Sequence, residues 1–405
     1  QIGGTCIELE ADGKRMVLDI GMPLDANDPD VVATPNVAGL DTDDPSLLGV
    51  LISHPHQDHY GLASRVNGRT TFLMGAATER ILLAAKDFTS SGGVFEHVIH
   101  LEDRKPIELG PFSIMPYLMD HSAYDAYAVL VEAGGRRLFY TGDLRGHGRK
   151  AKLFERLVSD PPSGVNVVLM EGTTITRSGT DAGFPSESDL ENEMVKLFQG
   201  TDGMPLVWCS GQNIDRLVTV FRAAKRTGRQ LILDMYTAHI LAATENLRLP
   251  QADWPEIRVF LPWSQKMRII KDQSFEIANM YRMARIYPEQ LAIAAKMSVM
   301  LFRPSMRKDL EKAGCLDGAS LIYSMWNGYL KDDSMQSFLK WLTERSIPMH
   351  KCHTSGHASV KDLQRLRAAF GDAVVVPIHT QQPELYEKAF GNVEIHSDGE
   401  SWEIN

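Results

Sequence analysis

The fold of this 405-residue chain is decided by the stretch Ser53-His54-Pro55-His56-Gln57-Asp58-His59-Tyr60-Gly61, which directly follows the apolar run 47–52. A short apolar run of this kind is typical of a buried strand. Three histidines and an aspartate within six positions offer the nitrogen and oxygen atoms that bind divalent metal ions. A lone histidine is most often structural, but this spacing behind a strand seldom arises by chance. The stretch therefore predicts a metal site where a strand ends.

Further candidate ligands stand where other strands are expected to end. His121 follows a strand expected from residue 112, and Asp143 follows a hairpin whose second strand ends at residue 140. His379 follows the apolar stretch 373–378. Either His121 or Asp143 alone could be structural. A site at the edge of a sheet would collect such residues.

Asp19 ends the second strand of a hairpin expected over residues 3–19, with its turn at Asp12-Gly13. A buried carboxylate lowers stability unless it is hydrogen-bonded. We expect Asp19 to accept hydrogen bonds from the turn that carries the ligands, and so to orient them from behind. A turn-capping role is the alternative.

The histidine motif, followed by His121 and Asp143 in that order, resembles the signature of the metallo-β-lactamase fold superfamily. The resemblance implies an α/β fold, an αβ/βα sandwich with a two-metal site at one edge. One divalent ion would be held by His54, His56 and His121, and the other by Asp58, His59 and His379, with Asp143 bridging. Imidazole ligands favour zinc, and the carboxylates leave manganese as the alternative.

Two later motifs resemble the β-CASP branch, and ribonuclease J in particular. They are Val167-Val168-Leu169-Met170-Glu171-Gly172-Thr173-Thr174 and His353-Thr354-Ser355-Gly356-His357-Ala358-Ser359. The resemblance implies catalytic roles for Asp58, Asp143, Glu171 and His357. His357 would contact the scissile phosphate or protonate the leaving oxygen, with Glu171 as its acidic partner.

The same resemblance suggests residues that bind substrate phosphate. Ser355 and the amide of Gly356 would hold a phosphate oxygen, and His353 and Arg303 are further candidates. A structural role for His353 is equally open, and Arg303 fits a solvated face as well as a phosphate clamp.

The pattern changes near residue 181, where helical periodicity over 189–198, 214–227 and 274–286 alternates with short strands. This alternation predicts a parallel sheet with helices on both faces. We expect a first metallo-β-lactamase segment over 1–180, an inserted β-CASP-like domain over 181–348, and a C-terminal metallo-β-lactamase segment over 349–405.

Composition narrows the function classes. The net charge of −10 argues against nucleic-acid binding through the whole surface, although a local basic groove stays open. Cys6, Cys209, Cys315 and Cys352 are scattered, which fits reduced thiols and a cytoplasmic location. No run of eighteen apolar residues occurs, so no membrane span is expected. A homodimer is compatible with the sequence.

The leading hypothesis is a cytoplasmic two-metal ribonuclease that cleaves single-stranded RNA with a metal-bridging hydroxide; DNA is the alternative substrate. One rival is a small-molecule hydrolase for an ester, lactone or cyclic phosphodiester. The acidic charge favours it, as does the stretch 300–307, where ribonuclease J has a phosphate-holding loop. Another rival is a non-catalytic binding subunit, against which the intact ligand set argues.

Overall fold

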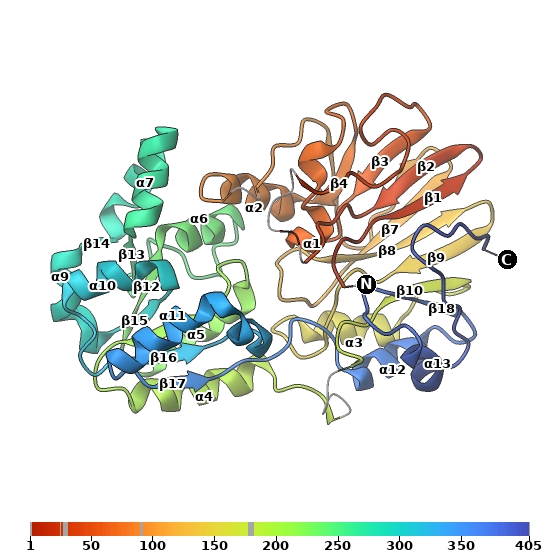
Figure 1. Cartoon of the computed structure of the whole chain (residues 1–405). Helices are drawn as coiled ribbons and strands as arrows, with labels where there is room; N and C mark the ends of the chain where they lie inside the picture. Colours follow the sequence, from red (N-terminus) through yellow and green to blue (C-terminus); the bar gives the residue numbers. More distant parts are fainter. Residues whose placement is uncertain (1, 25, 27–30, 90–91, 177–181, 405) are drawn as a thin grey trace. The chain divides into compact units, whose positions relative to one another are not determined.

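The computed structural model describes residues 2–24, 26, 31–89, 92–176 and 182–404, and these divide into two compact units (Figure 1). Unit 1 comprises Gln1–Leu83, Gly93–Phe184 and Gly356–Asn405, and unit 2 comprises Ala84–Gly92 and Pro185–Ser355. The expected boundary after residue 348 precedes strand β17 (Met349–Lys351), which pairs with β16 (Ser320–Tyr323) in unit 2. Residues 349–355 therefore lie with unit 2.

Unit 1 is built on two sheets. The first has the order β1-β2-β3-β4-β5, with strands Ile7–Ala11, Lys14–Leu18, Leu47–Leu51, Phe72–Gly75 and Val98–Leu101. The second has the order β18-β10-β9-β8-β7-β6. Its strands, in chain order from β6, are Ile107–Leu109, Phe112–Leu118, Tyr127–Ala133, Arg136–Tyr140, Val167–Glu171 and, for β18, Val374–Ile378.

The two sheets pack face to face around one apolar layer. Leu18 and Leu51 of the first sheet meet Val129 and Leu169 of the second in this layer. Because side chains alternate along a strand, neighbouring residues such as Val17 point to the outer faces, which helices cover.

Helices α1 (Gln57–Tyr60) and α2 (Ala76–Lys86) contribute to the outer layer of the first sheet. Helices α3 (Ala151–Ser159), α12 (Val360–Ala369) and α13 (Leu385–Phe390) cover the second. The layers confirm the predicted αβ/βα sandwich. A 3-10 turn, η2, spans Ala63–Arg65.

Unit 2 holds a parallel sheet with the order β14-β13-β12-β15-β11-β16-β17. Besides β16 and β17, its strands from β11 to β15 are Pro205–Trp208, Gln230–Asp234, Ile257–Phe260, Arg285–Ile286 and Ser298–Leu301. Its helices from α4 to α11 are Glu187–Gln199, Ile214–Arg226, Met235–Ala243, Trp263–Asp272, Phe275–Met280, Pro288–Ala294, Arg307–Ala313 and Asp333–Glu344. Short 3-10 turns span Arg282–Ala284, Ala295–Met297, Pro304–Met306 and Asn327–Lys331.

Helices cover both faces of this sheet, as predicted. Ile232 packs with Leu310 of α10 and Phe338 of α11, while alternation turns Leu231 to the opposite face, and α5 packs against β12. The predicted helix over 274–286 is wrong at its end. Helix α8 stops at Met280, and Arg285–Ile286 form a strand because they pair with Val259 and Phe260.

None of the helices within the described ranges combines the length and the apolar character needed to cross a bilayer.

Candidate metal centre

All the predicted metal ligands lie in unit 1, at the ends of strands or in the turn behind β3. Residues 53–56 continue from β3 into α1, which places Asp58 and His59 in the first turn of that helix. His121 follows β7, Asp143 follows β9 and His379 follows β18. The structure brings these candidate ligands together in two groups, one of three histidines and one that contains Asp143.

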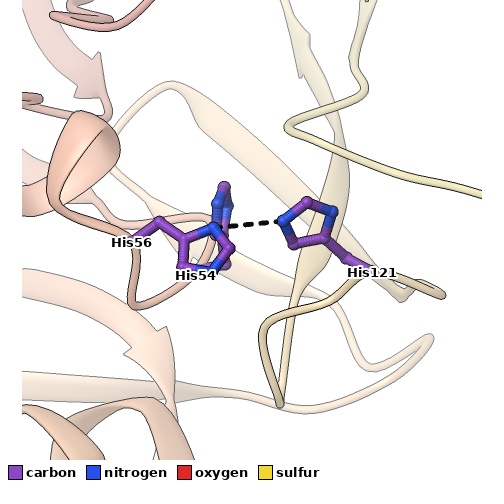
Figure 2. Close-up of side chains that lie close together, drawn as sticks. All are labelled: His54, His56 and His121. Carbon is purple, nitrogen blue, oxygen red and sulfur yellow. Dashed lines mark hydrogen bonds between the residues drawn. The ribbon is translucent and has the colours of Figure 1, made fainter. Parts of the chain in front are cut away.

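One group consists of His54, His56 and His121, whose ligand nitrogens lie within 4.8 Å of one another (Figure 2). His121 Nε2 and His56 Nδ1 are 3.2 Å apart. A tetrahedral zinc ion with Zn–N bonds of 2.0–2.1 Å would space two ligand nitrogens by about 3.3 Å. Buried His54 Nε2 has no hydrogen-bond partner among the described residues. This geometry fits a metal ion.

The protonation of these imidazoles also fits metal binding. Burial, followed by the neighbouring His59 and His121, holds the pKa of His54 well below its ordinary value. Burial likewise lowers the pKa of His56 to about 4 and depresses the pKa of His121. Neutral imidazoles keep the lone pairs that a divalent ion requires.

A second group contains Asp58, His59, Asp143 and His379. His59 Nε2 lies 3.2 Å from Asp143 Oδ2, and His379 Nε2 lies 3.1 Å from Asp58 Oδ2. Burial opposes the ionisation of Asp143, but His379 and His59 outweigh it and hold the pKa of Asp143 well below its ordinary value. Asp143 Oδ2 is also 3.8 Å from His54 Nε2, so this carboxylate lies between the two groups.

Buried residues next to the candidate ligands hold them in position through hydrogen bonds. Asp19 is fully buried and accepts from Ser53 N (2.6 Å), Ser53 Oγ (2.8 Å) and the Tyr140 hydroxyl. It lies 2.6 Å from His59 Nδ1, which leaves His59 Nε2 for the centre. Burial lowers the pKa of His59, but Asp143, Asp19 and Asp58 outweigh it and raise this pKa well above normal.

Sequence reasoning missed some of these partners. Thr173 Oγ1 lies 2.8 Å from His379 Nδ1, and Ser53 Oγ lies 3.0 Å from His54 Nδ1. Both residues stand inside the quoted motifs, Ser53 directly before His54 and Thr173 two residues after Glu171. That adjacency was the available signal, but only the fold shows which histidine each hydroxyl meets.

Glu171 and His357 meet beside Asp143, and with His379 they form a further group of candidate ligands. His357 Nδ1 lies 3.5 Å from both Glu171 Oε2 and Asp143 Oδ2. Glu171 is fully buried and accepts from the amides of Thr173 (3.1 Å) and Ala358 (3.4 Å). The His357 side chain is 19% exposed, whereas the Glu171 side chain is fully buried.

The predicted phosphate-binding residues have varied surroundings. A Cβ on Gly356 would lie 2.6 Å from Ser122 Oγ, so a larger residue would have to displace the Ser122 side chain beside His121. Ser355 is 4% exposed and, like His353, belongs to unit 2. Arg303, also in unit 2, forms an ion pair with buried Asp234 and donates to Thr237 Oγ1 (3.0 Å). Its charge therefore already has a counter-ion.

Comparisons with known proteins agree with the fold and the centre. Residues 28–207 match a family model described as a beta-lactamase superfamily domain. Ribonuclease J of Mycobacterium tuberculosis is 23% identical over 240 residues, 57% of this chain and 42% of that protein. Ribonuclease J of Sinorhizobium meliloti is 21% identical over 366 residues, 87% of this chain and 61% of that protein. The chain thus spans only part of these relatives.

A solved structure matches nearly the whole chain. It is a protein of unknown function from Enterococcus faecalis V583, with a TM-score of 0.77, 21% identity, and coverage of 99% of this chain and 96% of that one. The sandwich fold and its cluster of histidines and aspartates define the metallo-β-lactamase superfamily, whose fold implies divalent metal ions. Residues 28–207 of this chain are similar to a domain of that superfamily, and ribonuclease J proteins are among the proteins that the chain is similar to.

Proposed function

We propose that this protein is a metal-dependent ribonuclease of the β-CASP type that hydrolyses phosphodiester bonds of single-stranded RNA. The observation that supports it best is the position of His357, 3.5 Å from both Asp143 and Glu171 beside the ligand groups. A proton donor next to a metal centre is what hydrolysis of a phosphodiester requires. The ribonuclease J names of the relatives support RNA as the substrate.

In this proposal the ligand groups hold two divalent ions, zinc by preference because imidazoles dominate, with manganese as the alternative. When bound, such ions acidify water and stabilise negative charge on the attacking and leaving oxygens. Neutral His54, His56 and His121 would hold one ion, and Asp58, His59 and His379 the other. Ionised Asp143 would bridge them.

The remaining residues would handle protons and position the ligands. His357 would contact the scissile phosphate or protonate the leaving oxygen from its partly exposed position. Glu171, fixed by the amides of Thr173 and Ala358, would hold the protonated imidazole of His357. Thr173 would keep His379 Nδ1 engaged, so that His379 Nε2 faces the centre.

A small-molecule hydrolase on the same scaffold is the second candidate. The observation that favours it is the ion pair of Arg303 with Asp234, which reduces its capacity to clamp a phosphate. The net charge of −10 also favours a small-molecule substrate over RNA. Ester, lactone or cyclic nucleotide hydrolysis by the metal-loaded protein, without RNA cleavage, would favour this candidate.

The test is cleavage of labelled single-stranded RNA by the zinc- or manganese-loaded protein, with 5′-monophosphate, 5′-hydroxyl and circular substrates. Asp143→Asn is expected to lower cleavage to the level without enzyme, and the exposed Asp398→Asn serves as the matched control. Full activity of Asp143→Asn would contradict the bridging role. The preference among the three substrates would distinguish exonuclease from endonuclease action, because the circular RNA has no end.

His357→Ala is expected to retain its metal, measured by atomic emission, while cleavage falls by about 10²–10⁴-fold, as for the loss of a general acid. Unchanged cleavage would rule out the assigned role of His357. A joint loss of metal and activity would instead show that His357 is a ligand.

A further inference from the structure

A hollow lies in unit 2 and is lined by residues of β13, β14 and α9. Strands β13 and β14 lie at one edge of the parallel sheet (Figure 1). The volume of the hollow is about 340 Å³, within the range of small-molecule sites. Ile286, Ile293 and Ala294 supply its apolar lining, and Arg258, Arg285 and Gln290 supply donors. None of these residues has a part in the metal centre.

The two arginines lack a counter-charge within the described ranges. Arg258 donates only to the backbone carbonyls of Pro255 (3.3 Å) and Ile257 (3.0 Å), both through Nη1. The guanidinium of Arg285 lies over the Tyr287 ring, 5.4 Å from its centroid, and its buried Nε has no hydrogen-bond partner among the described residues. No described residue that lines the hollow is acidic.

The chain has 52 acidic and 42 basic residues, yet none of the acidic residues lines this hollow within the described ranges. Two cations that line one hollow repel each other, and an anion bound between them would relieve that repulsion. The hollow is therefore arranged to receive negative charge.

A third hydrogen-bond donor narrows the class of ligand that the hollow could bind. Gln290 Oε1 accepts from the Tyr287 amide (2.9 Å), so the Gln290 Nε2 group is left to donate. Two guanidinium groups and an amide match the oxygens of a phosphate, which guanidinium groups bind in bidentate fashion. The aliphatic wall suits the organic part of an ester.

We propose that this hollow binds a phosphate ester, with Arg258, Arg285 and Gln290 on the phosphate and Ile286 and Ile293 against the organic group. The ester could come from a free mononucleotide or from the backbone of a nucleic acid, since both present the same chemistry. The site does not depend on the proposed nuclease activity.

The test is isothermal titration of the metal-treated full chain in the Asp143→Asn background, which is expected to leave RNA uncut. One arm uses adenosine 5′-monophosphate, and the other a tetra-adenylate with hydroxyl ends. We expect Arg258→Gln and Arg285→Gln each to raise the Kd by about tenfold or more in at least one arm. The ligand whose binding is weakened shows whether the phosphate comes from a mononucleotide or from a nucleic-acid backbone.

Ile293→Glu tests the wall independently, because it adds a carboxylate to the hollow at a side chain that is 88% exposed and so spares the fold. It is expected to weaken binding as much as the arginine changes. Arg282→Gln, an exposed neighbour outside the hollow, is the matched control and should bind as the parent does. Binding that is equal in all variants, or absent in both arms, would overturn the proposal.

Discussion

Asp19 shows how much a single residue contributes behind the centre. It is fully buried, adopts a left-handed backbone with φ of +59°, and lies 2.6 Å from His59 Nδ1. His379 is also left-handed, with φ of +48°. Such conformations are uncommon outside glycine and cluster at functional sites, where the surrounding contacts hold them in place.

Asp19→Asn is a suitable probe, because asparagine tolerates the left-handed region, while the charge is lost and one acceptor oxygen becomes a donor. We expect metal affinity to fall by about 10–100-fold, as for other carboxylates that orient a ligand histidine. Competition with a chromophoric chelator would measure it. Tyr140→Phe removes one hydrogen-bond donor to Asp19 but keeps the carboxylate, so the decrease in metal affinity should be smaller. Equal affinity in Asp19→Asn and wild type would show that His59 needs no such partner.

At the scale of elements, the turn that carries the ligands depends on close packing against the end of the hairpin. Met22 N donates to Gln57 O (2.9 Å) and Ile20 N donates to His59 O (2.8 Å). A Cβ on Gly21 would lie 1.7 Å from the carbonyl oxygen of Asp58, which is backbone and cannot swing away. The segment after β2 thus sets the position of α1.

Gly21→Ala is expected to displace the turn, and so to lower both the melting temperature and the bound metal per chain. Gly68→Ala is the matched control within unit 1, because a Cβ there meets nothing within 4 Å. Calorimetry and atomic emission would follow the two quantities. A fully metallated Gly21→Ala variant with the wild-type melting temperature would contradict this packing argument.

At the scale of the whole molecule, each unit has apolar layers of its own. Unit 2 is also joined internally by Arg216, which is fully buried, forms an ion pair with Glu187 (3.0 Å) and donates to the Ser324 side chain. Separate cores favour separate unfolding transitions.

We expect two transitions in calorimetry. Removal of the metal by a chelator should lower only the free energy of unfolding of unit 1. The expected decrease is about 2.7 kcal/mol if the free metal concentration had been 100 times its Kd. Arg216→Met should lower only the free energy of unfolding of unit 2, by about 3–5 kcal/mol, since it removes the counter-charge of the buried Glu187. Arg222→Met on the same helix breaks a long, partly exposed pair with Glu191 (3.9 Å) and should cost about 1 kcal/mol or less. A single transition that responds to both changes would contradict independent cores.

The sequence by itself determined the turn that carries the candidate ligands and the positions along the chain of the more distant ones. Spacing within His54–His59 is a local property, and strand ends that carry polar residues stand out against apolar runs. The alternation of strands and helices likewise determined the parallel sheet of unit 2.

Only the tertiary structure decided which partners meet across the chain. Thr173 and His379 are 206 residues apart, and their contact depends on the pairing of β10 with β18. Periodicity favoured a helix through residue 286, but pairing of Arg285–Ile286 with β13 overrode that local preference. The same pairing brings Arg285 to the hollow that Arg258 also lines, because contacts between distant segments depend on packing and not on local pattern.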